Sequence, residues 1–140
     1  MRDFSSDWEQ AIARHTFRCA RCGKVASSVA LIVEKLPTDG PRGAGSGSGG
    51  LIAETGFFGE WWQAVARGAL APVADALRTG SASALYDIEP LWAPFYCPDC
   101  RLSYCDEHWD IRLEFDEDWP DWYDCAMGTC PSGHTRMVDD

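Results

Sequence analysis

Four short pairs of cysteine and histidine residues constrain the fold of this chain more than any other feature. Each pair has the spacing of two ligands to one metal ion. The pairs are Cys19-x2-Cys22, Cys97-x2-Cys100, Cys105-x2-His108 and Cys130-x3-His134. A tight turn brings both side chains of such a pair to one tetrahedral ion, at about 2.0–2.3 Å. Two pairs complete one site, so the four pairs predict two structural Zn²⁺ ions, because mixed Cys/His sets favour zinc over iron–sulfur clusters.

The cysteine count also indicates metal ligands rather than disulfides. The chain has seven cysteines, an odd number, so they cannot all pair within the chain. The N-terminal segment is polar and has no signal-peptide core, and no apolar run is long enough to span a membrane. We therefore expect a cytoplasmic protein that makes no membrane contact. The absence of asparagine and the excess of arginine over lysine are typical of a bacterial protein from a GC-rich genome.

The run from Cys97 to His108 resembles the middle of cross-brace zinc fingers, especially the AN-type fingers of stress-associated proteins. Its spacing is Cys-x2-Cys-x4-Cys-x2-His. In that family the first and third ligand pairs hold one ion, and the second and fourth pairs hold the other. Such fingers mostly serve as protein-binding modules. This chain departs from the family by placing 74 residues between the first and second pairs.

Three assignments of the ligand pairs remain open. A cross-brace assignment makes one site of Cys19, Cys22, Cys105 and His108, and another of Cys97, Cys100, Cys130 and His134. Sequential pairing instead gives one all-cysteine site and one site of two cysteines and two histidines. A local knuckle would use only the four ligands within residues 97–108. The four-residue spacer between the middle pairs favours different ions for them, so we expect the cross-brace assignment.

Two further candidate ligands, Cys125 and His15, stay outside these pairs. Cys125 lies among aromatic and acidic residues, and nearby carboxylates disfavour a reactive thiolate. We expect a partly buried small residue there, with an alternative metal ligand or a reactive thiol as the other possibilities. His15 precedes Cys19 with a spacing similar to that of zinc-associated anti-sigma factors. Because few residues precede it, we expect a surface histidine.

The apolar pattern predicts an α+β fold: a small antiparallel sheet with two or three short helices, built around the two zinc sites in one domain of residues 1–140. Helices are expected at residues 3–15 with Ser6 as N-cap, at 60–70, at 72–79 and at 83–88. Strands are expected at residues 25–33, 51–58 and 111–115, with a flexible Gly/Ser-rich loop at residues 40–50 joining the first two. Trp61 and Trp62 are expected in the core.

Negative charge is concentrated in residues 97–140, an acidic zinc-finger-like module. This module carries −9 of the chain's net charge of −10, which excludes a nucleic-acid-binding surface. Acidic and aromatic residues alternate in it, and the expected partner-binding residues are Asp116, Glu117, Asp118, Trp119 and Trp122. We therefore expect a protein-interaction or adaptor module whose acidic face binds a basic protein. Solvation alone would also account for the carboxylates.

The sequence gives little indication of an enzyme. It contains no HExxH, nucleophile elbow, P-loop or GxGxxG motif. Two alternatives to the adaptor remain. One is a thiol-based redox sensor that releases zinc on oxidation. The other is a metal-dependent hydrolase, which would need a zinc ion with only three protein ligands.

Overall fold

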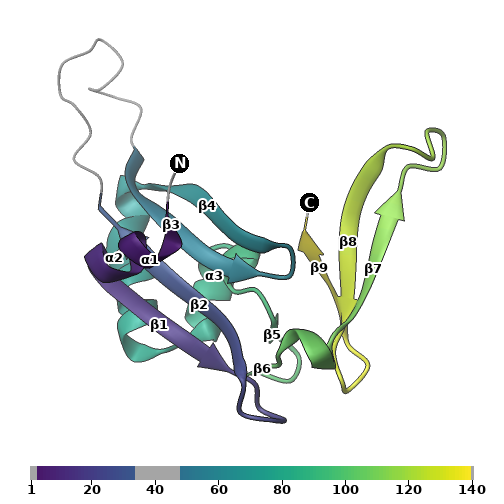
Figure 1. Ribbon diagram of the computed structural model, residues 1–140, viewed down its shortest axis with the longest axis horizontal. Coiled ribbons are helices and arrows are strands. Elements are labelled where there is room, and N and C mark those ends of the chain that lie inside the picture. The colour runs from purple at the N-terminus through teal and green to yellow at the C-terminus, as the bar shows by residue number, and fades with distance from the viewer. Residues whose placement is uncertain (1–2, 34–47, 140) are drawn as a thin grey trace.

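A four-stranded antiparallel sheet forms the larger part of the molecule (Figure 1). The structure is a computed structural model that describes residues 3–33 and 48–139. Strands β1 (Ala13–Arg18), β2 (Val25–Ile32), β3 (Ser48–Gly56) and β4 (Gly59–Ala66) follow one another in sheet order. The expected antiparallel pairing of β2 with β3 is confirmed. Ser48–Gly50, expected in the flexible loop, belong to β3, and residues 40–47 lie outside the described residues.

Helices cover both faces of this sheet. On one face, α2 (Leu70–Thr79), α3 (Ala82–Ile88) and two 3-10 turns, η1 (Arg67–Ala69) and η2 (Pro90–Trp92), follow β4. The main core there includes Val29, Leu31, Ile52, Val65, Val73, Leu77 and Leu85. On the other face, α1 (Phe4–Gln10) covers a smaller cluster around Ala30, Ile32 and Ala53. Alternate residues of β2 thus contribute to opposite cores, as a strand buried on both faces requires.

The C-terminal part forms two smaller antiparallel sheets. One joins β5 (Tyr96–Cys97) to β6 (Leu102–Ser103), and the 3-10 turn η3 (Asp106–His108) follows. The other has the order β7 (Asp110–Phe115), β8 (Tyr123–Thr129) and β9 (Thr135–Asp139). The hairpin of β7 and β8 extends away from the rest of the molecule, whereas β9 faces the turn between β3 and β4 (Figure 1). The fold is therefore α+β, as predicted, with three sheets.

The predicted helix at residues 3–15 is too long and its predicted cap is wrong. Asp3, not Ser6, is the N-cap, and its side chain accepts a hydrogen bond from the Ser5 backbone N–H at 3.1 Å. The helix ends at Gln10, and β1 begins at Ala13 because Ala13 and Phe17 on one face of the strand are buried in the main core. The strand predicted at residues 25–33 is confirmed as β2, which ends at Ile32; Val25 at its start and Val33 just after it are exposed.

The predicted helix at residues 60–70 is wrong, because residues 59–66 form β4. This strand pairs with β3, so that Glu54 lies opposite Trp61 and Ile52 lies opposite Gln63. Trp61 and Val65 are four residues apart, and residues four apart share a face in a helix and in a strand alike. Their spacing therefore could not distinguish the two structures. Trp61 remains 39% exposed, so it is not a core residue.

The other predicted elements differ from the structure only at their ends. Helix α2 begins at Leu70, so Pro72 is its third residue rather than its first. It ends at Thr79, and Gly80 has a left-handed φ of 68°. A Cβ atom at Gly80 would lie 2.6 Å from the ring of His15, so only glycine fits this end of the helix.

No helix among residues 3–33 and 48–139 is long and apolar enough to cross a membrane.

Candidate metal centres

Two groups of three cysteines and one histidine each take two ligands from residues 97–108. The N-terminal cluster consists of Cys19, Cys22, Cys105 and His108, and the C-terminal cluster consists of Cys97, Cys100, Cys130 and His134. Within each cluster the four ligand atoms lie within 4.8 Å of one another. The grouping is that of the cross-brace assignment: the first pair meets the third, and the second meets the fourth.

The N-terminal cluster connects the large sheet to the C-terminal part. Cys19 and Cys22 lie in the turn between β1 and β2. Cys105 directly precedes η3, and His108 is the last residue of η3. The Cys22 and Cys105 sulfurs are 3.6 Å apart. The Nδ1 atom of His108 lies 3.4 Å from the Cys19 Sγ and 3.2 Å from the Cys105 Sγ.

The C-terminal cluster connects the two smaller sheets. Cys97 and Cys100 come from β5 and the turn after it, whereas Cys130 and His134 come from the turn between β8 and β9. The Cys100 and Cys130 sulfurs are 3.8 Å apart. The Nδ1 atom of His134 lies 3.7, 3.3 and 3.5 Å from the Sγ atoms of Cys97, Cys100 and Cys130.

These separations match the edges of a tetrahedron around one metal ion. With Zn–S near 2.3 Å and Zn–N near 2.0–2.1 Å, such a tetrahedron has S···S edges of about 3.8 Å and S···N edges of about 3.6 Å. They are far too long for disulfide bonds, in which the sulfurs are about 2.05 Å apart, and none of the seven cysteines forms a disulfide. Each cluster can therefore hold one metal ion with four protein ligands.

The turns that carry the two Cys-x2-Cys pairs are built alike. In one, the Gly23 N–H donates to the Cys19 carbonyl at 2.9 Å, and in the other the Arg101 N–H donates to the Cys97 carbonyl at 2.8 Å. The residue after the second cysteine is left-handed in both, with φ of 77° at Gly23 and 58° at Arg101. Glycine adopts this conformation without strain, whereas arginine adopts it at a cost. Arg101 therefore takes in the second turn the left-handed position that Gly23 takes in the first.

Backbone N–H groups also point at the sulfurs. The Arg21 N–H donates to the Cys19 Sγ, the Cys100 N–H to the Cys97 Sγ and the His134 N–H to the Cys130 Sγ, each at 3.4 Å. Such bonds favour the thiolate, which is the form that binds metal. The backbone therefore supports a negative charge at both clusters.

Within each cluster, one cysteine has a low pKa and another a high one. Burial raises the pKa of Cys19, but hydrogen bonds from the backbone of Cys105, Arg21 and Cys22 outweigh it and lower that pKa to about 6. Interactions with the Tyr104 and Ser132 side chains lower the pKa of Cys100 to about 6. In contrast, burial raises the pKa values of Cys97 and Cys105 to about 11. The sequence does not indicate that Tyr104 and Ser132 meet Cys100, because no local pattern brings these residues together.

An aromatic cluster packs together with ligands of both metal centres. Phe95, Tyr104 and Trp109 are buried together with four of the cysteine ligands. The Trp109 indole N–H donates to the carbonyls of Phe95 and Tyr104, at 3.2 and 3.0 Å. These bonds fix the segment between Cys97 and Cys105, which supplies ligands to both clusters. Ligands of both metal clusters therefore belong to one buried cluster.

The remaining residues considered in the sequence lie away from the clusters. Cys125 is a half-buried residue of β8 outside both groups. His15 lies in β1, where its ring packs against Phe17 with centroids 4.7 Å apart. The five expected partner-binding residues, Asp116, Glu117, Asp118, Trp119 and Trp122, are exposed between β7 and β8.

The fold and these two sites define an α+β protein that can bind two metal ions through Cys3His ligand sets. The chain belongs to the family described as "Domain of unknown function (DUF8328)", which matches residues 9–140. No curated protein and no solved structure matches the chain.

Proposed function

We propose that the two clusters hold structural Zn²⁺ ions and that the protein is an interaction module for a basic protein partner. The observation that carries the first part is the ligand count. Each cluster supplies four protein ligands at tetrahedral separations, and four-coordinate Cys3His sites with no open position are typical of structural zinc. A hydrolytic zinc needs a free position for water, so these sets favour a structural role over the hydrolase alternative.

Metal analysis tests the zinc assignment. Protein purified without chelator is expected to contain two zinc ions per chain by elemental analysis. Removing zinc with a chelator should unfold the region around the clusters, because metal binding and folding are coupled in such sites. A content of one zinc ion or none, in protein that remains folded, would contradict the proposal.

The interaction surface that we propose is the tip of the β7–β8 hairpin, residues 115–123. Trp119 and Trp122 are 70% and 71% exposed, and together with Asp116 they line a shallow hollow of about 280 Å³. Asp116 also holds the turn, since its Oδ1 accepts hydrogen bonds from the N–H groups of Asp118 and Trp119 at 2.8 and 3.1 Å. The two tryptophans are therefore presented on an ordered turn.

The chemistry of the hairpin tip suits a cationic partner. Residues 115–123 contain four carboxylates and no basic residue. Exposed tryptophan rings attract lysine and arginine through cation–π contacts, and carboxylates add long-range attraction. Large exposed aromatic groups on a monomer mark interaction sites more often than solvated surface. These features together favour binding over a purely solvating role.

An octalysine peptide provides a direct probe of this surface. We expect calorimetry to detect binding to the metal-loaded protein that weakens as salt rises through about 0.15 M, where the Debye length is near 8 Å. The double variant Glu117→Gln/Asp118→Asn should weaken it without releasing zinc, and it leaves Asp116 in place to hold the turn. Glu9→Gln/Asp75→Asn removes the same charge from exposed sites elsewhere and serves as the control. Equal loss in both double variants would refute the hairpin tip as the specific surface.

Redox-dependent zinc release is a second candidate function, favoured by one observation. Cys22 is exposed, although the other cysteines of its cluster are buried, so an oxidant can reach one sulfur of the N-terminal cluster. Oxidation of a ligand thiolate would weaken the site. Titration with peroxide should then release one zinc ion well before the second, and simultaneous release only at high oxidant would argue against this role.

A further inference from the structure

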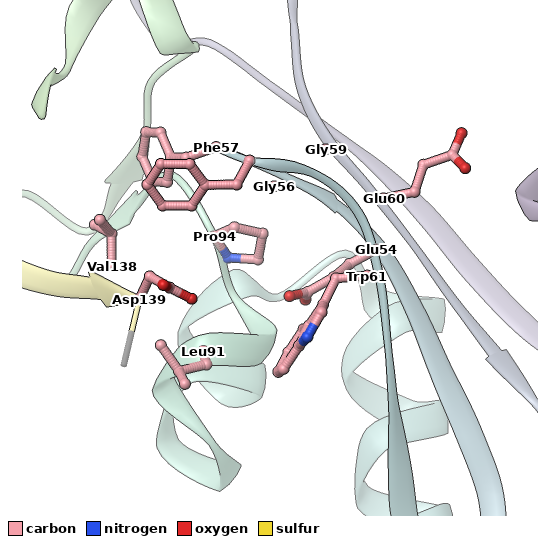
Figure 2. A pocket seen from close by; sticks show the side chains of 11 residues that line it. Glu54, Gly56, Phe57, Gly59, Glu60, Trp61, Leu91, Pro94, Val138 and Asp139 are labelled. Atoms are coloured by element: carbon pink, nitrogen blue, oxygen red, sulfur yellow. The ribbon is translucent and has the colours of Figure 1, made fainter. Parts of the chain in front are cut away.

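A small cavity lies between the large sheet and the C-terminal strand, away from both metal centres. It is bounded by the β3–β4 turn, the segment from η2 to Pro94, and β9 (Figure 2). Its volume is about 90 Å³, below the roughly 300–1,000 Å³ typical of pockets for whole small-molecule ligands. The cavity therefore fits one functional group and a short stem.

The carboxyl group of Glu54 forms the polar part of this cavity. Glu54 lies on β3 two residues after Ile52, so its side chain points to the same face as the main core, and it is only 4% exposed. Figure 2 shows its carboxylate beside the Trp61 ring, with the carboxylate of Asp139 directed toward it from β9. The Oε2 atom of Glu54 has no hydrogen-bond partner among the described residues. A buried carboxyl oxygen without a partner is costly, so the site is incomplete without another group.

The ionisable side chains that line the cavity are all acidic. The residues that line it include Glu54, Glu60 and Asp139 but no lysine, arginine or histidine. Arg136 affects Glu54 only through the attraction between their charges. Its guanidinium hydrogen bonds go to backbone carbonyls instead: Nη1 donates to those of Ala93 and Tyr96, and Nη2 donates to that of Pro90. Glu89 adds a further negative charge near Glu54. A cation is therefore the complementary ligand.

The walls of the cavity are apolar and aromatic. Phe57, Trp61, Leu91, Pro94 and Val138 line the cavity together with the carboxyl group of Glu54. Aromatic faces stabilise a cation within about 6 Å, and apolar walls accept the methylene stem of an alkyl amine. A compact ammonium group needs one strong acceptor here, whereas the planar fork of a guanidinium is matched by two parallel oxygens.

We propose that this cavity is a binding site for a primary alkylammonium group, with the ammonium against Glu54 Oε2 and the alkyl stem along Trp61 and Leu91. The group can come from a free amine or from a lysine side chain of a partner protein. The site is separate from the hairpin tip, and the proposal does not depend on binding there.

NMR titration of the metal-loaded full chain tests the proposal. The readout is the indole N–H signal of Trp61, assigned by its loss in Trp61→Phe. The probes are n-butylammonium, N-acetyl-lysine amide and the uncharged n-butanol. We expect both cations to shift the Trp61 signal saturably and n-butanol to leave it unchanged. Glu54→Gln should weaken cation binding at least tenfold, whereas Glu60→Gln, which removes the same charge from an exposed position of the lining, should change it less than threefold.

The pattern of binding among the three probes identifies the ligand class or overturns the proposal. Binding of n-butylammonium but not of N-acetyl-lysine amide identifies a free amine as the ligand class, and binding of both identifies a site that also accepts a lysine side chain. Equal shifts by n-butanol, or equal weakening by Glu54→Gln and Glu60→Gln, would overturn the proposal. No shift by either cation in the wild-type protein would also overturn it, whatever the stability of the variants. The double variant Glu117→Gln/Asp118→Asn should bind the cations as the wild type does.

Discussion

The buried environment of Glu54 disfavours the charged form of its carboxyl group. Burial raises its pKa well above 4.5, the charge of Arg136 opposes this rise, and the charge of Glu89 adds to it. The folded state therefore keeps the proton of Glu54 to a higher pH than the unfolded chain does. The contribution of this group to stability is fully present below about pH 4.5 and is lost as pH rises toward the higher pKa of the folded state.

Glu54→Gln is expected to remove this pH dependence. The variant should gain stability relative to wild type as pH rises above 4.5, by up to about 1.4 kcal/mol per pH unit, until the folded-state pKa is passed. Urea unfolding of both metal-loaded proteins across pH 6 to 9 measures the difference between their free energies of unfolding. An effect of metal loss that is common to both proteins cancels in this difference. Glu60→Gln, at an exposed position, should show a flat difference. A flat difference for Glu54→Gln as well would contradict a folded-state pKa of Glu54 raised into this pH range.

At the scale of elements, the Arg136 side chain connects β9 to the segment after α3. Arg136 is 7% exposed, and its guanidinium donates to the backbone carbonyls of Pro90, Ala93 and Tyr96. Its Cζ also lies 5.1 Å from the centre of the Tyr86 ring. The side chain therefore joins the C-terminal sheet to the segment after α3, between the large sheet and the C-terminal cluster.

Arg136→Lys is expected to lower the free energy of unfolding by about 2–4 kcal/mol. A lysine ammonium cannot reach three carbonyls in the geometry of a planar guanidinium, so buried acceptors lose their partners. Arg112→Lys is the matched control, because Arg112 is largely exposed and pairs with Glu114, and it should change stability by less than about 0.5 kcal/mol. Equal effects of the two substitutions, measured by urea unfolding, would show that the carbonyl bonds contribute little.

The sequence predicted the elements whose periodicity was unambiguous and missed those that depend on tertiary contacts. Helix α3 and the end of α2 were predicted because Pro90 and Gly80 mark local boundaries. Strand β4 was missed because the spacing of Trp61 and Val65 fits both a helix and a strand, and only pairing with β3 decides between them. The ligand pairs were visible from local spacing, but Glu54 and Arg136 are functional candidates only through contacts with remote segments.

At the scale of the whole molecule, the metal clusters join parts of the chain that are far apart in sequence. The N-terminal cluster ties the β1–β2 turn to η3, and the C-terminal cluster ties β5 to the β8–β9 turn. A direct hydrogen bond from the Ala20 N–H to the Ser103 carbonyl, at 2.8 Å, adds to the first connection. We therefore expect residues from Cys19 to His134 to unfold as one cooperative unit when both metals are bound.

Cys22→Ser tests this cooperativity. The variant should lose the metal of the N-terminal cluster and unfold at a lower urea concentration than wild type, in both the large sheet and the C-terminal part. Cys125→Ser, a cysteine change outside both clusters, should keep two metal ions and wild-type stability to within about 1 kcal/mol. If residues 90–140 alone bound two metal ions and folded as stably as the full chain, the clusters would not connect the two parts.

Cadmium NMR of the metal-substituted protein tests the central claim, that each site is a Cys3His set shared between remote ligand pairs. Cadmium replaces zinc at such sites, and its chemical shift reports the number of sulfur ligands. The account predicts two cadmium signals, both typical of three sulfurs and one nitrogen, with one coupled to the β-protons of Cys19, Cys22 and Cys105. The other should couple to those of Cys97, Cys100 and Cys130. One all-sulfur signal together with one signal of two sulfurs and two nitrogens, or a single signal, would contradict the account.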